Sequence, residues 1–175
     1  MRLLHVAILF SALAVAVVPD HLAGQEVARN ALYVELGGSG GVASMNYERR
    51  ISAARLRIGA AQWSVDDLLG GGSESYLIIP LTVSSVRGSG RHHLETGGGV
   101  GFGRYSQTSS LDDTKSSDSF VTLSGIIGYR FQKPGSGFLF RAVFTPMYGL
   151  GDEDVAWPQR GFYPLAGISF GYAFR

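Results

Sequence analysis

Residues 161–175 of the chain read GFYPLAGISFGYAFR. Every second residue from Phe162 to Phe174 is apolar or aromatic, whereas the alternate residues from Leu165 to Ala173 are mostly small. Successive residues of a β-strand point to opposite faces of its sheet. This segment therefore predicts a strand whose large apolar side chains face lipid and whose small side chains line a narrow interior, as on a membrane-spanning barrel.

The composition of the whole chain fits this interpretation. The chain has 175 residues, enough for one domain, of which 25 are Gly and only 17% are charged, compared with a usual charged share of about 25%. A net charge of +1 gives no basic face for nucleic acid. The chain has no Cys, which excludes disulfides and zinc–thiolate sites. No motif calls for a cofactor.

The N-terminal segment has the organisation of a secretory signal peptide. Arg2 is followed by an apolar run from Leu3 to Val18, and then by the small and polar residues 19–25. A permanent transmembrane helix needs about 20 apolar residues, and this run is shorter. We therefore expect a signal peptide over residues 1–24 and an outer-membrane β-barrel domain over residues 25–175.

Runs with a period of two recur along the domain and are separated by turn residues. Six are clear, at residues 55–63, 75–84, 93–105, 120–131, 138–148 and 162–174. An even strand count places both termini in the periplasm, so residues 31–51 are interpreted as two strands, 31–37 and 42–51, joined at Gly38–Gly41. The prediction is an all-β fold, an eight-stranded antiparallel up-and-down transmembrane β-barrel. Residues 87–91 and 132–137 are expected to form periplasmic turns, and residues 107–117 and 151–160 external loops.

Several charged residues fall on the predicted inward faces. They lie toward the periplasmic half and are Glu48, Arg57, Glu95, Arg130 and Arg141. Eight strands enclose a space that side chains fill, and arginine–carboxylate pairs would offset the cost of enclosing these charges. We interpret the cluster as a structural plug of salt bridges; a proton or ion path is the alternative.

Aromatic residues are expected to form two girdles at the membrane interfaces. Near the outer strand ends lie Trp63, Tyr76, Tyr105, Tyr148 and Trp157, and near the inner ends lie Tyr47, Tyr129, Phe131 and Phe138.

Several segments resemble small eight-stranded outer-membrane barrels of the OmpA and OmpX type, and most closely the uncharacterised outer-membrane barrel proteins of Bacteroidota-type bacteria. The matching segments are NALYVELGGSGG (30–41), NYERR (46–50), IPLT (79–82), HLETG (93–97) and GYAF (171–174). The resemblance implies location in the bacterial outer membrane, contact with its lipids and lipopolysaccharide, and insertion by the barrel assembly machinery. We expect a monomer with no nucleic-acid partner.

Some eight-stranded outer-membrane barrels are enzymes that modify lipid A, so a catalytic role needs a test. Such a site needs His with Ser and an acid near the outer leaflet. In the mature chain His92 and His93 begin a strand at the opposite, periplasmic end.

The acidic residues of the external loops are Asp112, Asp113, Asp118, Asp152, Glu153 and Asp154, and their spacing fits no EF-hand.

The sequence therefore predicts a non-enzymatic barrel with a structural or surface-interaction role. The alternative is a narrow pore or small-solute transporter, and an enzyme that modifies lipid A comes third.

Overall fold

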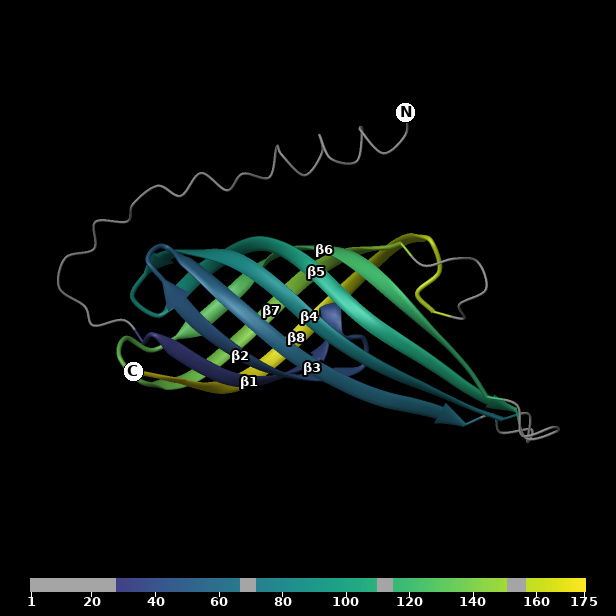
Figure 1. Ribbon diagram of the computed structural model, residues 1–175. Coiled ribbons are helices and arrows are strands. Elements are labelled where there is room, and N and C mark those ends of the chain that lie inside the picture. The colour runs from purple at the N-terminus through teal and green to yellow at the C-terminus, as the bar shows by residue number, and fades with distance from the viewer. Residues whose placement is uncertain (1–27, 67–71, 110–114, 151–156) are drawn as a thin grey trace, which may run out of the picture.

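The computed structural model describes residues 28–66, 72–109, 115–150 and 157–175, which form a closed barrel of eight strands (Figure 1). The elements are β1 (Asn30–Gly37), the short 3-10 helix η1 (Gly38–Gly40), β2 (Ala43–Ile51), β3 (Ala54–Asp66), β4 (Gly72–Ser89), β5 (His92–Ser109), β6 (Lys115–Gln132), β7 (Gly137–Gly149) and β8 (Gly161–Phe174). Each strand pairs antiparallel with its sequence neighbours, and β8 closes the barrel against β1. The predicted fold class is confirmed. In the described part of the chain, no helix is long and apolar enough to cross a membrane.

The closing pair of strands sets the end at which the chain begins and ends. Asn30 lies opposite Phe174, and Gly37 lies opposite Gly167. The start of β1 and the end of β8 therefore share one end of the barrel, together with the turns at Gly90–Arg91 and 133–136. We call this the terminal end, and the other the far end.

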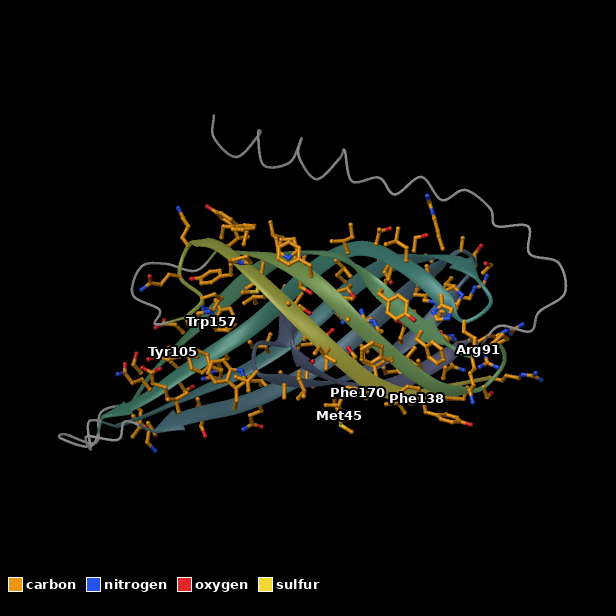
Figure 2. All side chains as sticks on the ribbon, turned by 180° about the vertical axis from the view of Figure 1, so that it is seen from behind. Met45, Arg91, Tyr105, Phe138, Trp157 and Phe170 are labelled. Carbon is orange, nitrogen blue, oxygen red and sulfur yellow. The ribbon has the colours of Figure 1, made fainter. Side chains whose placement is uncertain are left out.

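The alternation in residues 161–175 has the predicted orientation. Phe162, Ile168, Phe170 and Tyr172 are 48–63% exposed, whereas Ser169 is fully buried. A large apolar side chain that is 40–66% exposed occurs on every strand: Leu32, Met45, Ile58, Ile79, Phe102, Ile127, Phe144 and Phe170, from β1 to β8. Figure 2 labels Met45, Phe138 and Phe170 on this outer wall. So continuous an apolar surface is typical of a barrel wall in contact with lipid.

The strands differ in length, and this gives the molecule its asymmetric shape. β1 and β2 have 8 and 9 residues, whereas β4, β5 and β6 have 18 each. Figure 1 shows β3 to β6 running past the rest of the barrel at the far end. The predicted loop at residues 107–117 is therefore too long: Gln107 pairs with Ser116 and Thr108 with Lys115. The hydrogen bonds between paired strands use backbone atoms and do not need apolar side chains. The polar residues at the ends of β5 and β6 therefore continue the two strands, where the sequence predicted a loop.

The β1–β2 connection turns inward at the far end. Gly37, Gly38 and Gly41 have φ of 77°, 70° and 82°, which glycine adopts without the steric cost of a Cβ. The resulting η1 buries Gly38, Ser39 and Gly40. This connection therefore contributes side chains to the lumen instead of projecting outside.

Candidate functional site

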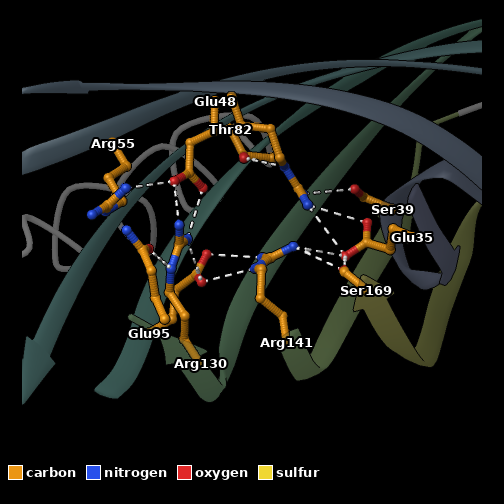
Figure 3. A network of polar contacts seen from close by, with 11 residues as sticks. Glu35, Ser39, Glu48, Arg55, Thr82, Glu95, Arg130, Arg141 and Ser169 are labelled. Atoms are coloured by element: carbon orange, nitrogen blue, oxygen red, sulfur yellow. Dashed lines mark hydrogen bonds and ion pairs between the residues drawn. The ribbon is translucent and has the colours of Figure 1, made fainter. Parts of the chain in front are cut away.

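The most highly charged part of the lumen is a chain of buried arginines and glutamates (Figure 3). Six ion pairs join the residues in the order Arg55, Glu48, Arg130, Glu95, Arg141, Glu35 and Arg57, so that positive and negative charges alternate. All seven are at most 5% exposed. We call these seven residues the lumen network.

The centre of the network consists of two bidentate pairs. Arg141 donates from Nε and Nη2 to Glu95 at 2.9 and 2.8 Å. Arg130 donates from Nη1 and Nη2 to Glu48 at 3.0 and 2.8 Å. A contact of 3.3 Å between Arg130 Nη1 and Glu95 Oε2 joins the two pairs. The planar guanidinium matches the carboxylate in this geometry, which makes these the strongest contacts of the lumen.

Hydroxyl groups complete the network at the end nearer η1. Glu35 accepts from Arg141 Nη1 at 3.1 Å and from Ser169 Oγ at 3.3 Å. Arg57 Nε donates to Thr82 Oγ1 at 2.8 Å, and its Nη2 donates to Ser39 Oγ at 3.0 Å. The seven network residues lie on six strands, and Thr82 from β4 and Ser169 from β8 add hydrogen bonds to them from the remaining two.

The five charged residues predicted to face inward, Glu48, Arg57, Glu95, Arg130 and Arg141, all lie in the network. Sequence reasoning missed Glu35 and Arg55. Both were detectable from the period of two: Glu35 alternates with Val34 and Leu36, and Arg55 has the parity of Arg57. That the network acts as a structural plug stays a proposal.

A second layer of the lumen, toward the far end, is aromatic. Trp63 stacks on Tyr76 with ring centroids 4.0 Å apart, and Tyr105 lies 5.1 Å from Tyr76. Trp157 packs against Trp63 at 5.7 Å and against Phe120 at 6.4 Å. Both tyrosine hydroxyls donate to Glu74, at 3.0 and 3.1 Å. We call these aromatic residues the aromatic layer.

The aromatic layer corrects the predicted outer girdle. Tyr76 and Tyr105 are only 3% and 4% exposed, and Trp63 and Trp157 pack with them, so these four residues face the lumen and not the membrane. Of the five outer aromatics, Tyr148 alone is exposed, at 43%. The inner girdle agrees better, since Tyr47, Tyr129 and Phe138 are 37–47% exposed; Phe131 is partly exposed.

Glycines in β5 make room for the side chains that fill the lumen. A Cβ on Gly103 would overlap the ring of Phe120, and a Cβ on Gly101 would overlap the hydroxyl of Thr122. The glycine-rich run from Gly97 to Gly103 is therefore a packing feature of the wall.

The two mature-chain histidines lie at the terminal end, where β5 begins. His92 is exposed, and its Nδ1 lies 2.6 Å from Tyr129 Oη. His93 pairs with Arg130 across β5 and β6. The described residues contain no group of three or more His, Asp or Glu that could hold a metal ion. Of the acidic residues expected in the loops, Asp118 lies in β6, and the other five lie outside the described residues, as does the predicted signal peptide.

A closed antiparallel barrel of eight strands, with an apolar wall and a lumen filled by side chains, defines the class of small outer-membrane β-barrels. Among solved structures, the chain is similar to the N-terminal β-barrel domain of Pseudomonas aeruginosa OprF, with a TM-score of 0.58, 14% identity, and coverage of 84% of this chain and 99% of that one. It also resembles Ail, the attachment invasion locus protein of Yersinia pestis, with a TM-score of 0.49, 13% identity, and coverage of 85% and 98%.

The likeness to OprF is one of fold. No protein-family model and no curated protein matches the sequence. The resemblance to Bacteroidota-type barrels stays a prediction.

Proposed function

We propose that this chain is a non-enzymatic barrel of the bacterial outer membrane, with a closed lumen and a surface-interaction role at its far end. The observation that carries the proposal is the apolar wall, present on all eight strands, combined with the projection of β3 to β6 beyond it. An apolar wall of this kind is stable only in lipid. The projecting strands are then the part that reaches external partners.

The projecting sheet has two edges at which backbone groups lack a strand partner. The last pair of β2 with β3 is Met45–Ala60, and the last pair of β6 with β7 is Thr122–Gly149. Beyond these pairs, residues 61–66 and 115–120 pair with a strand on one side only, within the described parts of the chain. A row of unpaired N–H and C=O groups is a template for adding a strand from a partner.

The filled lumen argues against the alternative of a narrow pore. Glu48, Glu95, Arg130 and Arg141 are 0–1% exposed, so their side chains close the lumen at this level. The aromatic layer lies between them and the far end. A pore would have to separate ion pairs in a low-dielectric interior, which is costly.

The positions of the histidines argue against an enzyme that modifies lipid A. His92 and His93 lie at the terminal end, whereas such a site needs a base near the outer leaflet. Comparing the mass of lipid A from cells with and without the protein tests this alternative. A changed acylation pattern would contradict our proposal.

Fractionation tests the location. The mature protein should be recovered with outer membranes and should migrate differently on gels before and after heating. Recovery in the soluble periplasm would contradict the proposed location. In planar bilayers we expect no steady conductance, and defined single-channel steps would favour the pore.

Site-specific photo-crosslinking tests the surface role on intact cells. A photoreactive residue at Ser117, on β6 next to the unpaired edge, should form adducts with external protein. The matched position Ser89, at the terminal end of β4, should form none with external protein. If neither position forms such adducts, the structural role remains and the surface-interaction role fails.

A further inference from the structure

The near-neutral net charge conceals a strong charge asymmetry along the barrel. Basic side chains gather around the terminal end, at the ends of strands and in turns: Arg29, Arg49, Arg50, Arg87, Arg91, Lys133 and Arg175. All except Arg50 are exposed. Figure 2 shows Arg91 at this end, opposite Tyr105 and Trp157. We call these seven residues the basic rim.

The described part of the chain places its acidic side chains elsewhere. Glu35, Glu48 and Glu95 are buried in the lumen network. Glu74 and Asp118 lie on the projecting strands at the far end. On the outer surface of the terminal end, the described residues therefore include basic side chains and no Asp or Glu.

Some residues of the basic rim lie on the lipid-facing wall. Arg49 follows Tyr47 on the outward face of β2 and is paired across to Leu56 of β3. Arg87 of β4 lies beside Leu94 of β5, which lies beside Tyr129 of β6. Leu94 and Tyr129 are 52% and 40% exposed. These arginines thus mark the border between the apolar wall and water.

At this border the surface has an open hollow of about 320 Å³. Arg87, His92 and His93 are its polar lining residues, and Leu94 and Tyr129 provide its apolar side. The hydrogen bond between His92 Nδ1 and Tyr129 Oη, together with the edge contact of the His92 ring on Phe131 at 5.6 Å, holds the imidazole in place. The hollow thus combines a guanidinium, an oriented imidazole and an apolar wall.

We propose that this hollow binds the headgroup phosphate of an anionic phospholipid in the periplasmic leaflet. Arg87 is placed to donate to phosphate oxygens, for which a guanidinium is well suited. The acyl chains would lie against Leu94 and Tyr129, and an aromatic ring at this depth is typical of the headgroup level. The inference rests on the proposed membrane location and adds the lipid class and the site.

The orientation of the side chains favours a lipid over an acidic protein. A periplasmic protein would meet the turn residues Arg91 and Lys133, which lie at the tip of the barrel. Arg87 instead lies in register with residues of the apolar wall. A basic residue near an anionic membrane surface contributes about 1 kcal/mol, which corresponds to about a fivefold change in lipid preference.

Lipid retention in nanodiscs tests the site. The full mature barrel is placed in nanodiscs of mixed phosphatidylcholine and phosphatidylglycerol, and native mass spectrometry measures the lipids that remain bound after release. The wild type should retain phosphatidylglycerol preferentially, and R87Q should reduce this preference about fivefold, with a further loss in R87Q/H92Q. The matched control is R104Q, which removes an exposed arginine of β5 toward the far end.

Two results would overturn the lipid site directly. Equal retention of both lipids by the wild type, or an equal preference in wild type and R87Q, would overturn it. A loss in R91Q/K133Q but not in R87Q would assign the basic rim to a partner at the tip and would also overturn it. Heat-modifiable migration of every variant shows that the barrel is folded. Failure of the wild type to enter nanodiscs would count against the proposed location instead.

Discussion

Replacing Arg141 with Met should destabilise the barrel strongly, because Arg141 pairs with two glutamates of the lumen network and also contacts Ser169 and Tyr33. Its guanidinium makes the bidentate contact with Glu95, reaches Glu35 at 3.1 Å and Ser169 at 3.2 Å, and lies 4.9 Å above the ring of Tyr33. Met has a similar length and no charge. The change therefore removes the ion pairs while keeping most of the volume.

The expected loss in the free energy of unfolding depends on the contacts that remain for Glu95 and Glu35 once Arg141 is replaced. Among the described residues, Glu95 retains only the 3.3 Å contact with Arg130, while Glu35 retains Arg57 at 3.1 Å and Ser169. Removing one partner of a buried pair costs about 3–5 kcal/mol, because a charge stays buried without compensation. With a urea m value of about 2 kcal/mol/M, a loss of about 4 kcal/mol lowers the unfolding midpoint by about 2 M.

Urea unfolding in lipid vesicles, followed by tryptophan fluorescence, measures this midpoint. Removing the stranded charge in R141M/E95Q should restore part of the loss. R104Q is the control, since Arg104 is exposed and hydrogen-bonded to Ser117, and exposed charges contribute about 0–1 kcal/mol. An unchanged midpoint in R141M would show that Arg141 is not buried against carboxylates, and the register of β7 would have to be redrawn.

Three further predictions concern packing, the aromatic layer and orientation. G103A should lower the free energy of unfolding by about 1–3 kcal/mol, because its Cβ overlaps Phe120, and F120A should relieve that clash in the double variant; additive losses would contradict this packing. The protein's only tryptophans, Trp63 and Trp157, pack within the aromatic layer, so brominated lipids should quench their fluorescence weakly. Strong quenching would show that the tryptophans face lipid, as in the predicted outer girdle. A single Cys at Gln159 should react with an impermeant maleimide on intact cells and one at Ser89 only in opened cells, and the reverse pattern would invert the barrel.

Most of the wall could be predicted from the sequence, because each strand residue faces either lipid or lumen. The period of two in residues 161–175 and the even strand count lead directly to eight antiparallel strands. The same period placed five network residues inside. The pairing of charges within the network could not be predicted. The Glu95–Arg141 contact joins β5 to β7, which are not neighbours in the barrel. The positions of two such strands along the barrel axis depend on the register of each strand pair between them.

The predictions that were wrong, for Tyr76, for the loop between β5 and β6 and for Trp157, differ in whether the sequence could have corrected them. Tyr76 could have been placed correctly, because Leu77 and Ile79 face outward and Tyr76, which is adjacent to Leu77 on the same strand, must then face inward. The extension of β5 and β6 could not have been predicted. Their Ser- and Thr-rich ends pair through backbone hydrogen bonds, and these do not depend on the hydropathy of the side chains. Trp157 precedes β8 in irregular structure, where no period applies.

The lumen network also bears on how one register is selected. A slip of one residue turns every side chain of a strand to the opposite face. For β7 this slip would move Arg141 into the lipid, where an arginine costs about 2–4 kcal/mol near the bilayer midplane, and would leave Glu95 and Glu35 buried without it. Small residues such as Ser169 and Ala173 would tolerate the opposite face far better, so they distinguish the registers only weakly. The ion pairs of the network join residues of six strands, β1, β2, β3, β5, β6 and β7. A slip of any one of these six strands would therefore break ion pairs that join strands across the lumen.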